Sequence, residues 1–365
     1  MKIKTSKELL QQAISITENV VSPRTTLPIL SNILIETIDQ NKVRFAATDL
    51  DMGVVCNIKA EVEEAGAITV PAKKINDIIR ELPAGEIIIT SKKNYAVTIE
   101  CEKAFFKLVG LPKEDFPNLP NITDKEIIIL EQLTLKQMLK KTSFAMSREE
   151  TRYILNGVLL VVKPTKVIVV ATDGRRLAKI EKNISMGKDF NRQVIIPLKA
   201  VNEIMRILKD EGKINIALGE NQVIFEMDDI VLTTRQIEGE YPNYEQVIPK
   251  EIEDKVFVDR EKFLAAVKRA GIFTSTDSQS IKIDLFKNKM VISKSTPDIG
   301  EAREEIEVEY KGTELTVGFN PVYIIDALKN LEENSITMEL VNMEKPGVIR
   351  DGKDYVYIVL PMQLI

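Results

Sequence analysis

Ala47-Thr48-Asp49 returns as Ala171-Thr172-Asp173, 124 positions later in the chain. A second stretch, Val70-Pro71-Ala72-Lys73, corresponds to Ile196-Pro197-Leu198-Lys199, 126 positions later. Both pairs occur in the same order and at nearly the same spacing. A repeat of this length can fold as a compact domain with its own core, unlike the short units of a solenoid.

The repeat continues beyond these two stretches. Phe116-Pro117-Asn118 corresponds to Tyr241-Pro242-Asn243, 125 positions later, and a third, more divergent copy begins near residue 252. In that copy, Phe319-Asn320-Pro321 stands where the second copy has Ile196-Pro197-Leu198. The sequence therefore predicts three tandem, similar domains. Their predicted limits are residues 1–125, 126–251 and 252–365.

Each copy shows the same order of predicted elements. A capped helix with a narrow apolar face comes first, hairpins of alternating residues follow, and a second helix precedes further hairpins. In the first copy the leading hairpin is expected over residues 32–37 and 43–48. This order predicts an α+β fold with two helices on one face of an antiparallel sheet in each domain. The six helices are expected over residues 5–21, 72–82, 133–150, 198–210, 259–271 and 321–332.

The bulk composition is that of an ordinary globular protein. The 365 residues are 44% hydrophobic and 29% charged, and no apolar run approaches the roughly 18 residues that a membrane-spanning helix needs. The first residues lack the apolar core of a secretion signal. Cys56 and Cys101 are the only cysteines, too few for a disulfide framework across three domains. We therefore expect a cytoplasmic protein with no membrane association.

The sequence offers no groups for the common kinds of catalysis. It contains no histidine, which is the most frequent general base and metal ligand. It also lacks the GxxxxGK[ST], HExxH, CxxC and GxSxG motifs that carry phosphate binding, zinc binding and acyl transfer. These absences favour a non-enzyme without a cofactor or a metal.

Charge is distributed unevenly. The net charge is −5, which argues against nucleic-acid binding by the whole surface. The six predicted helices nevertheless carry 16 Lys and Arg against 12 Asp and Glu. A locally basic helical layer is compatible with a surface that faces phosphates and equally with ordinary solvated helices.

Five motifs carry a resemblance to a known family. They are Arg24–Leu30 (RTTLPIL), Arg152–Gly157 (RYILNG), Ala171–Ala178 (ATDGRRLA), Tyr241–Tyr244 (YPNY) and Leu360–Leu364 (LPMQL). With the threefold repeat and the length, the chain resembles the bacterial DNA polymerase III β subunit, the sliding clamp, over all its residues. The resemblance implies a non-catalytic processivity factor of DNA replication. It implies a ring-shaped, head-to-tail homodimer that encircles double-stranded DNA and slides without reading sequence.

The resemblance also implies a hydrophobic peptide pocket between the second and third domains. Its expected partners are the DNA polymerase III α subunit, the clamp-loader δ subunit, and other proteins with a clamp-binding motif, such as repair polymerases, mismatch-repair proteins and ligase. Aliphatic and methionine walls suit such adaptable peptide binding. The matching positions are Leu155, Thr172, Gly174, Arg175, Arg176, Leu177, Pro242, Val247, Asn320, Tyr323, Ile358, Val359, Leu360, Pro361 and Met362.

Two further surfaces follow from the resemblance. The DNA-facing positions are Arg24, Lys73, Arg80, Lys136, Lys140, Lys141, Arg148, Arg152, Tyr153, Lys199 and Arg206. The dimer-interface positions are Lys74, Phe106, Lys107, Leu108, Ile272, Phe273, Glu301 and Glu304. Two residues depart from the family pattern. Arg175 stands where histidine is common, which is expected to favour peptides with acidic flanks, and Glu149 stands where glutamine is familiar, which weakens DNA contact there.

Two alternatives remain open at the level of sequence. Asp49 and Asp51 follow an apolar strand at a spacing that a magnesium-dependent phosphotransferase could use. Against it, the second copy has Arg175 in place of Asp51, and Asp49 and Asp173 are expected to cap equivalent turns. The other alternative is a scaffold that binds only proteins.

Overall fold

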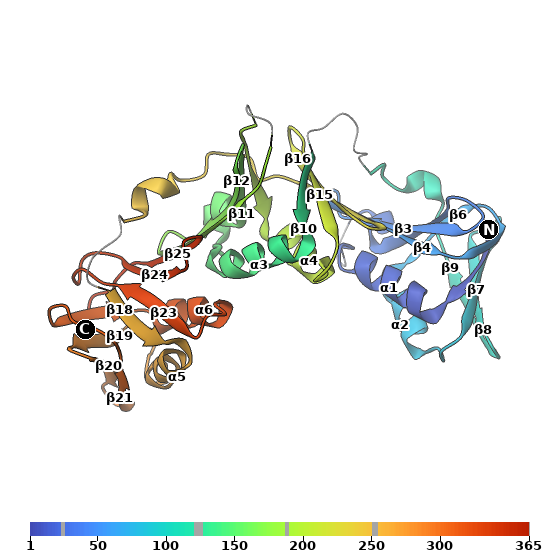
Figure 1. Ribbon diagram of the computed structural model, residues 1–365. Coiled ribbons are helices and arrows are strands. Elements are labelled where there is room, and N and C mark those ends of the chain that lie inside the picture. The colour runs from blue at the N-terminus through green and yellow to red at the C-terminus, as the bar shows by residue number, and fades with distance from the viewer. Residues whose placement is uncertain (23–25, 120–126, 187–189, 250–254, 365) are drawn as a thin grey trace. The chain divides into compact units, whose positions relative to one another are not determined.

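The computed structural model describes residues 1–22, 26–119, 127–186, 190–249 and 255–364 (Figure 1). Within these ranges the chain is mixed α and β, and every strand pair is antiparallel. The predicted α+β class is confirmed. No helix of the described residues is long and apolar enough to cross a membrane.

All six predicted helices are present. Ser6 caps the first by accepting a hydrogen bond from the Leu9 amide at 3.3 Å, and Asp259 caps the fifth by accepting one from the Lys262 amide at 2.8 Å. Such caps satisfy amides that have no partner within the helix. The helices are α1 (Lys7–Glu18), α2 (Ala72–Glu81), α3 (Gln132–Thr142), α4 (Leu198–Ile207), α5 (Arg260–Gly271) and α6 (Pro321–Asn330).

The predicted end of the third helix, at residue 150, is wrong. The helix ends at Thr142, whose backbone leaves the helical region with φ −125°. The Thr142 hydroxyl donates to the Met138 carbonyl of the same helix at 2.8 Å, a local bond that competes with helix continuation. Short 3₁₀ turns follow over Ser143–Ala145 and Glu150–Leu155.

The strands repeat in three sets. The first set is β1 (Lys2–Ser6), β2 (Asn32–Thr37), β3 (Lys42–Thr48), β4 (Met52–Lys59), β5 (Glu61–Glu64), β6 (Ala67–Pro71), β7 (Glu86–Ser91), β8 (Ala96–Cys101) and β9 (Ala104–Val109). The second is β10 (Ile127–Glu131), β11 (Gly157–Lys163), β12 (Lys166–Thr172), β13 (Arg176–Asn183), β14 (Arg192–Pro197), β15 (Lys213–Leu218), β16 (Gln222–Met227) and β17 (Ile230–Arg235). The third is β18 (Lys255–Asp259), β19 (Ile281–Phe286), β20 (Lys289–Thr296), β21 (Gly300–Glu307), β22 (Leu315–Phe319), β23 (Ser335–Glu339), β24 (Gly347–Asp351) and β25 (Tyr355–Val359).

Among the described residues, two of the four sheets are shared between neighbouring repeats. One has the order β10-β15-β16-β17-β4-β3-β2-β6, and the other has the order β14-β11-β12-β13-β25-β24-β23-β18. The shared sheets arise because β17 of the second repeat pairs with β4 of the first, and β25 of the third pairs with β13 of the second. The remaining sheets, β5-β1-β7-β8-β9 and β21-β20-β19-β22, belong to the first and third repeats.

The chain packs into two compact units. The first combines residues 1–135 with 202–236, and the second combines residues 136–201 with residue 237 onward. The division falls within α3 and α4, so the second repeat contributes to both units. The predicted domain limits at 125/126 and 251/252 lie outside the described residues and stay predictions.

Each unit builds its core from helices laid on strands. In the first, α1 packs beside α2 and onto β3 and β4 (Figure 1), and Leu10 and Ile14 of α1 are fully buried. In the second, α5 packs beside α6, with Phe263 and Ile324 fully buried. Burial of such apolar side chains is the main favourable term in folding.

Candidate functional site

The centre of the predicted pocket is the turn that joins β12 to β13. The Thr172 hydroxyl donates to the Arg176 carbonyl at 2.6 Å and accepts from the Gly174 amide at 3.0 Å. An Asp173 carboxylate oxygen accepts from the amides of Arg175 and Arg176 at 2.9 and 3.0 Å. Gly174 has φ +85°, a left-handed conformation that glycine adopts without strain.

The first repeat builds the same turn between β3 and β4. The Thr48 hydroxyl donates to the Met52 carbonyl at 2.9 Å, and an Asp49 oxygen accepts from the amides of Asp51 and Met52 at 3.1 and 2.7 Å. The expectation that Asp49 and Asp173 cap equivalent turns is confirmed. The Asp49 carboxylate therefore accepts hydrogen bonds from backbone amides. The described residues hold no group of three or more His, Cys, Asp or Glu side chains able to bind a metal.

Arg176 ties the turn to the third repeat. Its side chain is only 9% exposed, and its guanidinium donates to Asp173 at 3.0 Å, to Asp326 of α6 at 2.7 Å and to the Phe144 carbonyl at 2.7 Å. It also stacks over the Tyr323 ring of α6 at 4.6 Å. A buried guanidinium needs such partners to offset its lost hydration. Arg176 therefore supports the pocket floor and joins two repeats within the second unit.

Burial sets the electrostatics around this turn. Burial by itself lowers the pKa of Arg176, but the nearby Tyr357, Asp326 and Asp173 raise it above its ordinary value. Burial raises the pKa of Tyr244 to about 12, and that of Tyr241 still further. Both tyrosines therefore stay neutral at physiological pH.

Strand pairing brings the predicted apolar wall together. Ile358 of β25 lies opposite Leu177 of β13, and the Leu360 amide donates to the Arg175 carbonyl at 2.9 Å just beyond the strand. Leu177 and Ile358 belong to one buried cluster with Tyr241 and Tyr244. The segment 241–244 thus packs on the face of the shared sheet that carries Leu177 and Ile358.

All fifteen predicted pocket residues lie in the second unit, at different depths. The buried members are Thr172, Leu177, Ile358 and Val359, and the half-buried members are Leu155, Arg176, Asn320, Tyr323 and Pro361. The exposed members are Gly174, Arg175, Pro242, Val247, Leu360 and Met362. Val359 follows Ile358 on a strand, so its side chain points to the opposite face. It is fully buried and supports the wall from the core side.

A pocket of about 200 Å³ opens beside Arg175. It includes Arg175, Arg176 and Tyr323 from the predicted set. Its lining residues are Met146, Ser147, Arg148, Glu149, Asp173, Arg175, Arg176 and Tyr323. Met146 and Ser147 were missed because the helix predicted from the sequence included residues 143–149. The Thr142-Ser143 pair was the available signal for the break.

The end of the described chain lies on the third repeat. The Met362 amide donates to the Gly318 carbonyl at 2.8 Å, and the Ser280 hydroxyl donates to the Gln363 carbonyl at 3.3 Å. Leu360, Met362 and Leu364 keep 44%, 36% and 38% of their surface exposed. These apolar side chains extend the wall beyond β25.

Several predicted DNA-facing residues are exposed on helices or loops. Lys73 and Arg80 lie on α2, Lys199 lies on α4, and Arg148 lies in the loop after α3. Lys140 is exposed on α3 and pairs with Glu332 at 3.1 Å. Arg206, also exposed, pairs with Glu203 one turn earlier, with Nε 3.1 Å from a carboxylate oxygen. Arg24 lies outside the described residues.

Other members of that set are engaged within the fold. Lys141 is half-buried and pairs at 2.6 Å with Asp351, whose side chain is 7% exposed; Lys136 is also half-buried. The Arg152 guanidinium donates to the Asp173 carbonyl at 2.6 Å, and the Tyr153 hydroxyl donates to the Glu238 carbonyl at 3.1 Å. Lys141 is thus held by an ion pair, and Arg152 braces the turn between β12 and β13.

The predicted dimer-interface residues of the first unit lie on β9 and α2. β9 ends its sheet, and Phe106 and Leu108 are half-buried on one of its faces. Lys107 is exposed on β9, and Lys74 is exposed on α2. The other face of β9 carries Phe105 and Val109, which are 61% and 75% exposed. Sequence reasoning missed these two, because alternation alone does not say which face of an edge strand is covered.

In the second unit the predicted interface residues lie near β21, which also ends its sheet. Ile272 is 72% exposed just beyond α5, and Phe273 lies against Gly300. Glu301 is exposed, whereas Glu304 pairs with Arg269 of α5 at 2.6 Å. That hydrogen bond lowers the pKa of Glu304.

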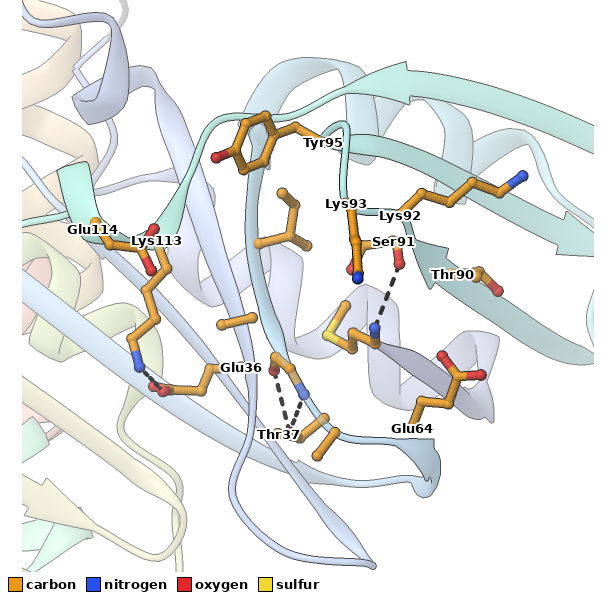
Figure 2. A pocket seen from close by; sticks show the side chains of 15 residues that line it. Glu36, Thr37, Glu64, Thr90, Ser91, Lys92, Lys93, Tyr95, Lys113 and Glu114 are labelled. Atoms are coloured by element: carbon orange, nitrogen blue, oxygen red, sulfur yellow. Dashed lines mark hydrogen bonds and ion pairs between the residues drawn. The ribbon is translucent and has the colours of Figure 1, made fainter.

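The first unit also contains a pocket of about 990 Å³ that no predicted site residue lines (Figure 2). Its rim alternates in sign, with Lys92, Lys93 and Lys113 set among Glu36, Glu64 and Glu114. Lys113 pairs with Glu36 on one side of it, as Figure 2 shows. With its charges paired or mixed, this pocket does not indicate a ligand class.

Three family models match the chain in sequence. They describe the N-terminal, central and C-terminal domains of the DNA polymerase III beta subunit and match residues 1–120, 129–243 and 245–363. The chain is 35% identical over 364 residues to a beta sliding clamp of Chlamydia pneumoniae, covering 100% of this chain and 99% of that protein.

Solved structures agree with these matches. A DnaN sliding clamp from Pseudomonas aeruginosa, bound to griselimycin, is 31% identical with a TM-score of 0.95. A DNA polymerase sliding clamp from Bacillus subtilis is 30% identical with a TM-score of 0.95. Both comparisons cover 100% of either chain. The chain belongs to the DNA polymerase III beta subunit family, the beta sliding clamps.

Proposed function

We propose that this chain is the processivity clamp of DNA polymerase III. Two copies join head to tail into a ring around double-stranded DNA in the cytoplasm. The ring slides without sequence preference and catalyses no reaction itself. It tethers the polymerase III α subunit, the clamp-loader δ subunit and further clients through the pocket around Leu177.

The pattern of strand junctions carries this proposal. Each repeat ends in a strand, namely β9, β17 and β25, and each contains an equivalent receiving strand, namely β4, β13 and β21. Two junctions form within the chain, β17 with β4 and β25 with β13. β9 and β21 remain as end strands of their sheets. A second copy completes the series by pairing β9 of one protomer with β21 of the other.

The chemistry of the two edges supports that pairing. β9 presents exposed Phe105 and Val109 together with Lys107, and β21 presents exposed Glu301 and Glu305. An unpaired edge with apolar side chains tends to add another strand, and opposite charges favour one partner orientation. The contact joins two different surfaces, and such a contact closes into a ring only when its rotation permits.

The exposed cations on the helices supply the DNA contact. Lys73, Arg80, Lys140 and Lys199 are suited to phosphate, which positions a protein without reading bases. Enclosure by the ring makes tight binding unnecessary, so a few such contacts suffice.

The pocket wall suits short partner peptides. Leu177, Ile358, Leu360 and Met362 provide an aliphatic surface, and Arg175 adds a cation at the rim. Such a surface accepts varied apolar side chains, while strand-edge groups fix the peptide backbone.

Two measurements test the proposal. Sedimentation at micromolar concentration should give twice the 41.2 kDa chain mass. Loaded with clamp loader and ATP, the protein should remain on a nicked circular plasmid and leave it after linearisation. Equal retention on circular and linear DNA would contradict encirclement, and no retention on either DNA would favour a scaffold that binds only proteins.

A further inference from the structure

The two strand junctions within the chain have the same register. At the first, Val231 of β17 lies opposite Val55 of β4, and at the second, Val356 of β25 lies opposite Lys179 of β13. Counted along the paired strands from the start of the first helix of each repeat, Val231 and Val356 are equivalent. Counted in the same way from the start of the second helix, Val55 and Lys179 are equivalent. The register is therefore a property of the repeat.

The same count identifies the pair that a second copy would form. In the first repeat it leads from the start of α1 through β1, β7 and β8 to Phe105 of β9. In the third repeat it leads from the start of α6 through β22, β19 and β20 to Arg303 of β21. A seam built like the internal junctions therefore sets Phe105 of one protomer opposite Arg303 of the other.

The open edge of β9 presents its backbone groups as this register requires. The Gly110 amide donates to the Tyr95 carbonyl at 2.8 Å, so the even-numbered residues of β9 bond to β8. In an antiparallel ladder the alternate residues then direct their amides and carbonyls to the other side. At the second junction the Leu360 amide donates to the Arg175 carbonyl at 2.9 Å, and Leu360 is equivalent to Val109. The odd-numbered residues of β9 thus face the seam, as their equivalents face the internal junction.

Charge selects the same register independently. In this register Lys107 lies opposite Glu301 and Lys103 opposite Glu305, and all four residues are exposed in the protomer. A slip of two residues in one direction would place Lys107 opposite Arg303. The same slip in the other direction would place Lys103 opposite Arg303. Like charges directly opposite each other on a sheet are unfavourable, and a slip of one residue would turn every side chain to the wrong face.

The opposite face of the two strands fits as well. Leu108 of β9 is half-buried and comes opposite Gly300 of β21. A Cβ built on Gly300 would stand 2.9 Å from the Cε1 atom of Phe273, so the ring lies against the bare glycine. Because Gly300 has no side chain, Leu108 of the partner can reach the ring of Phe273.

These observations single out one residue of the seam. Resting on the head-to-tail dimer proposed above, we propose that Arg303 sets the register in which β9 of one protomer pairs with β21 of the other. Arg303 is exposed in the protomer, and in this register its guanidinium meets the ring of Phe105, a favourable cation–π partner. The lysines two residues to either side of Phe105 repel Arg303 in both slipped registers. Arg303 therefore acts by favouring one pairing and by opposing its competitors.

Mixing two charge variants tests the pairing of Lys107 with Glu301. Lys107→Glu alone and Glu301→Lys alone each place like charges at both seams, and each should raise the dimer dissociation constant roughly fivefold. In an equimolar mixture the two substituted positions meet with opposite charges at one seam, and the other seam is wild type. Sedimentation of the mixture should therefore show wild-type affinity.

The matched control mixes Lys107→Glu with Glu305→Lys. Glu305 is exposed on the same face of the same strand, but its substitution places a lysine opposite Lys103. This mixture should stay weak. Recovery in the control and not in the first mixture would overturn the register.

Disulfide trapping tests the role of Arg303. Ala302→Cys with Phe106→Cys should give a covalent dimer on oxidation. Ala302→Cys with Leu108→Cys should not, because that pair is offset by two residues, with Cβ atoms about 7–8 Å apart where a disulfide needs about 4 Å. Adding Arg303→Glu should increase cross-linking of the offset pair, since Lys107 then favours the slip. Ala302→Cys alone controls for the two native cysteines, which are buried.

The outcomes separate the register from the dimer. Preferential cross-linking of the offset pair without Arg303→Glu would overturn the register, as would a dimer in which neither pair cross-links. Cross-linking of the offset pair that Arg303→Glu leaves unchanged would overturn the role of Arg303. A wild-type protein that sediments as a monomer would overturn the dimer and the register together. The charge variants alter only exposed side chains, so they remain a test if Phe106→Cys does not fold.

Discussion

The turns at residues 48–52 and 172–176 have one backbone and two roles. In both, a threonine hydroxyl and an aspartate carboxylate satisfy the same carbonyl and amide groups. The last residue differs: Met52 is buried in the first repeat, whereas Arg176 reaches Asp326 of the third repeat. The fourth residue changes from Asp51 to Arg175 at an exposed position. The Thr-Asp pair thus maintains the turn, and the positions that it does not constrain carry the specialisation.

The largest expected effect comes from giving the second turn the residue of the first. Arg176→Met removes the guanidinium and leaves Asp326 and the Phe144 carbonyl without their partner. Loss of one member of a largely buried ion pair costs about 3 kcal/mol. Urea denaturation of the purified variant should show this loss, and binding of the polymerase α peptide should weaken at least tenfold.

Arg175→Met is the matched control for that substitution. It removes the neighbouring, exposed arginine and should leave the unfolding free energy within about 0.5 kcal/mol of wild type. Equal stability of the Arg176 and Arg175 variants would show that the hydrogen bonds of Arg176 add nothing to the free energy of unfolding.

The two capping aspartates should differ in a measurable way. Asp49→Ala and Asp173→Ala each remove two hydrogen bonds to backbone amides, at a cost of about 1–2 kcal/mol. Asp173→Ala should cost about 1 kcal/mol more, because its other oxygen also pairs with Arg176. A double-mutant cycle with Arg176→Met isolates that increment, which should vanish in the Arg176→Met background.

The third residue of each turn gives a smaller contrast of opposite sign. Leu50 has φ +79° and Gly174 has φ +85°. Leu50→Gly removes the side chain from a left-handed backbone position and so relieves its steric strain. The change should stabilise the first unit by up to about 1 kcal/mol. Gly174→Ala should destabilise the second unit, since its Cβ would also lie 3.0 Å from an Arg152 nitrogen. Thermal unfolding of both variants checks the signs; two shifts in the same direction would refute the comparison.

The smallest effect is expected at the fourth residue. Arg175→Asp gives the pocket rim the charge found in the first repeat. Because Arg175 is exposed, the change should weaken binding of a peptide with acidic flanks only about threefold at low salt. A peptide with neutral flanks should be unaffected, and the difference should fade at high salt. Fluorescence anisotropy at two salt concentrations distinguishes these cases.

The sequence predicted what depends on local pattern. Alternating apolar residues placed the hairpin of β2 and β3, and the paired Ala-Thr-Asp motifs placed both turns. Helix α3 was extended too far because residues 143–149 remain helix-compatible, and the Thr142 bond to Met138 is visible only in the structure. That error hid Met146 and Ser147 at the pocket.

Contacts between distant residues were beyond the sequence. Arg176 was expected to line the pocket, but its partner Asp326 stands 150 positions away. The side of β9 that exposes Phe105 and Val109 likewise depends on what packs against the other side. Spacing within a strand or turn contains neither kind of information.

The shared sheets also determine when the first repeat can complete its sheet during translation. β4 pairs with β17, and Cys56 of β4 lies opposite Ile230, which is synthesised 174 residues later. At about 5–20 residues per second, translation leaves the outer edge of β4 without its neighbour for roughly 10–35 s. An open edge on a growing chain invites pairing with other nascent strands. The first repeat must therefore survive on the ribosome as an incomplete sheet until the second repeat emerges.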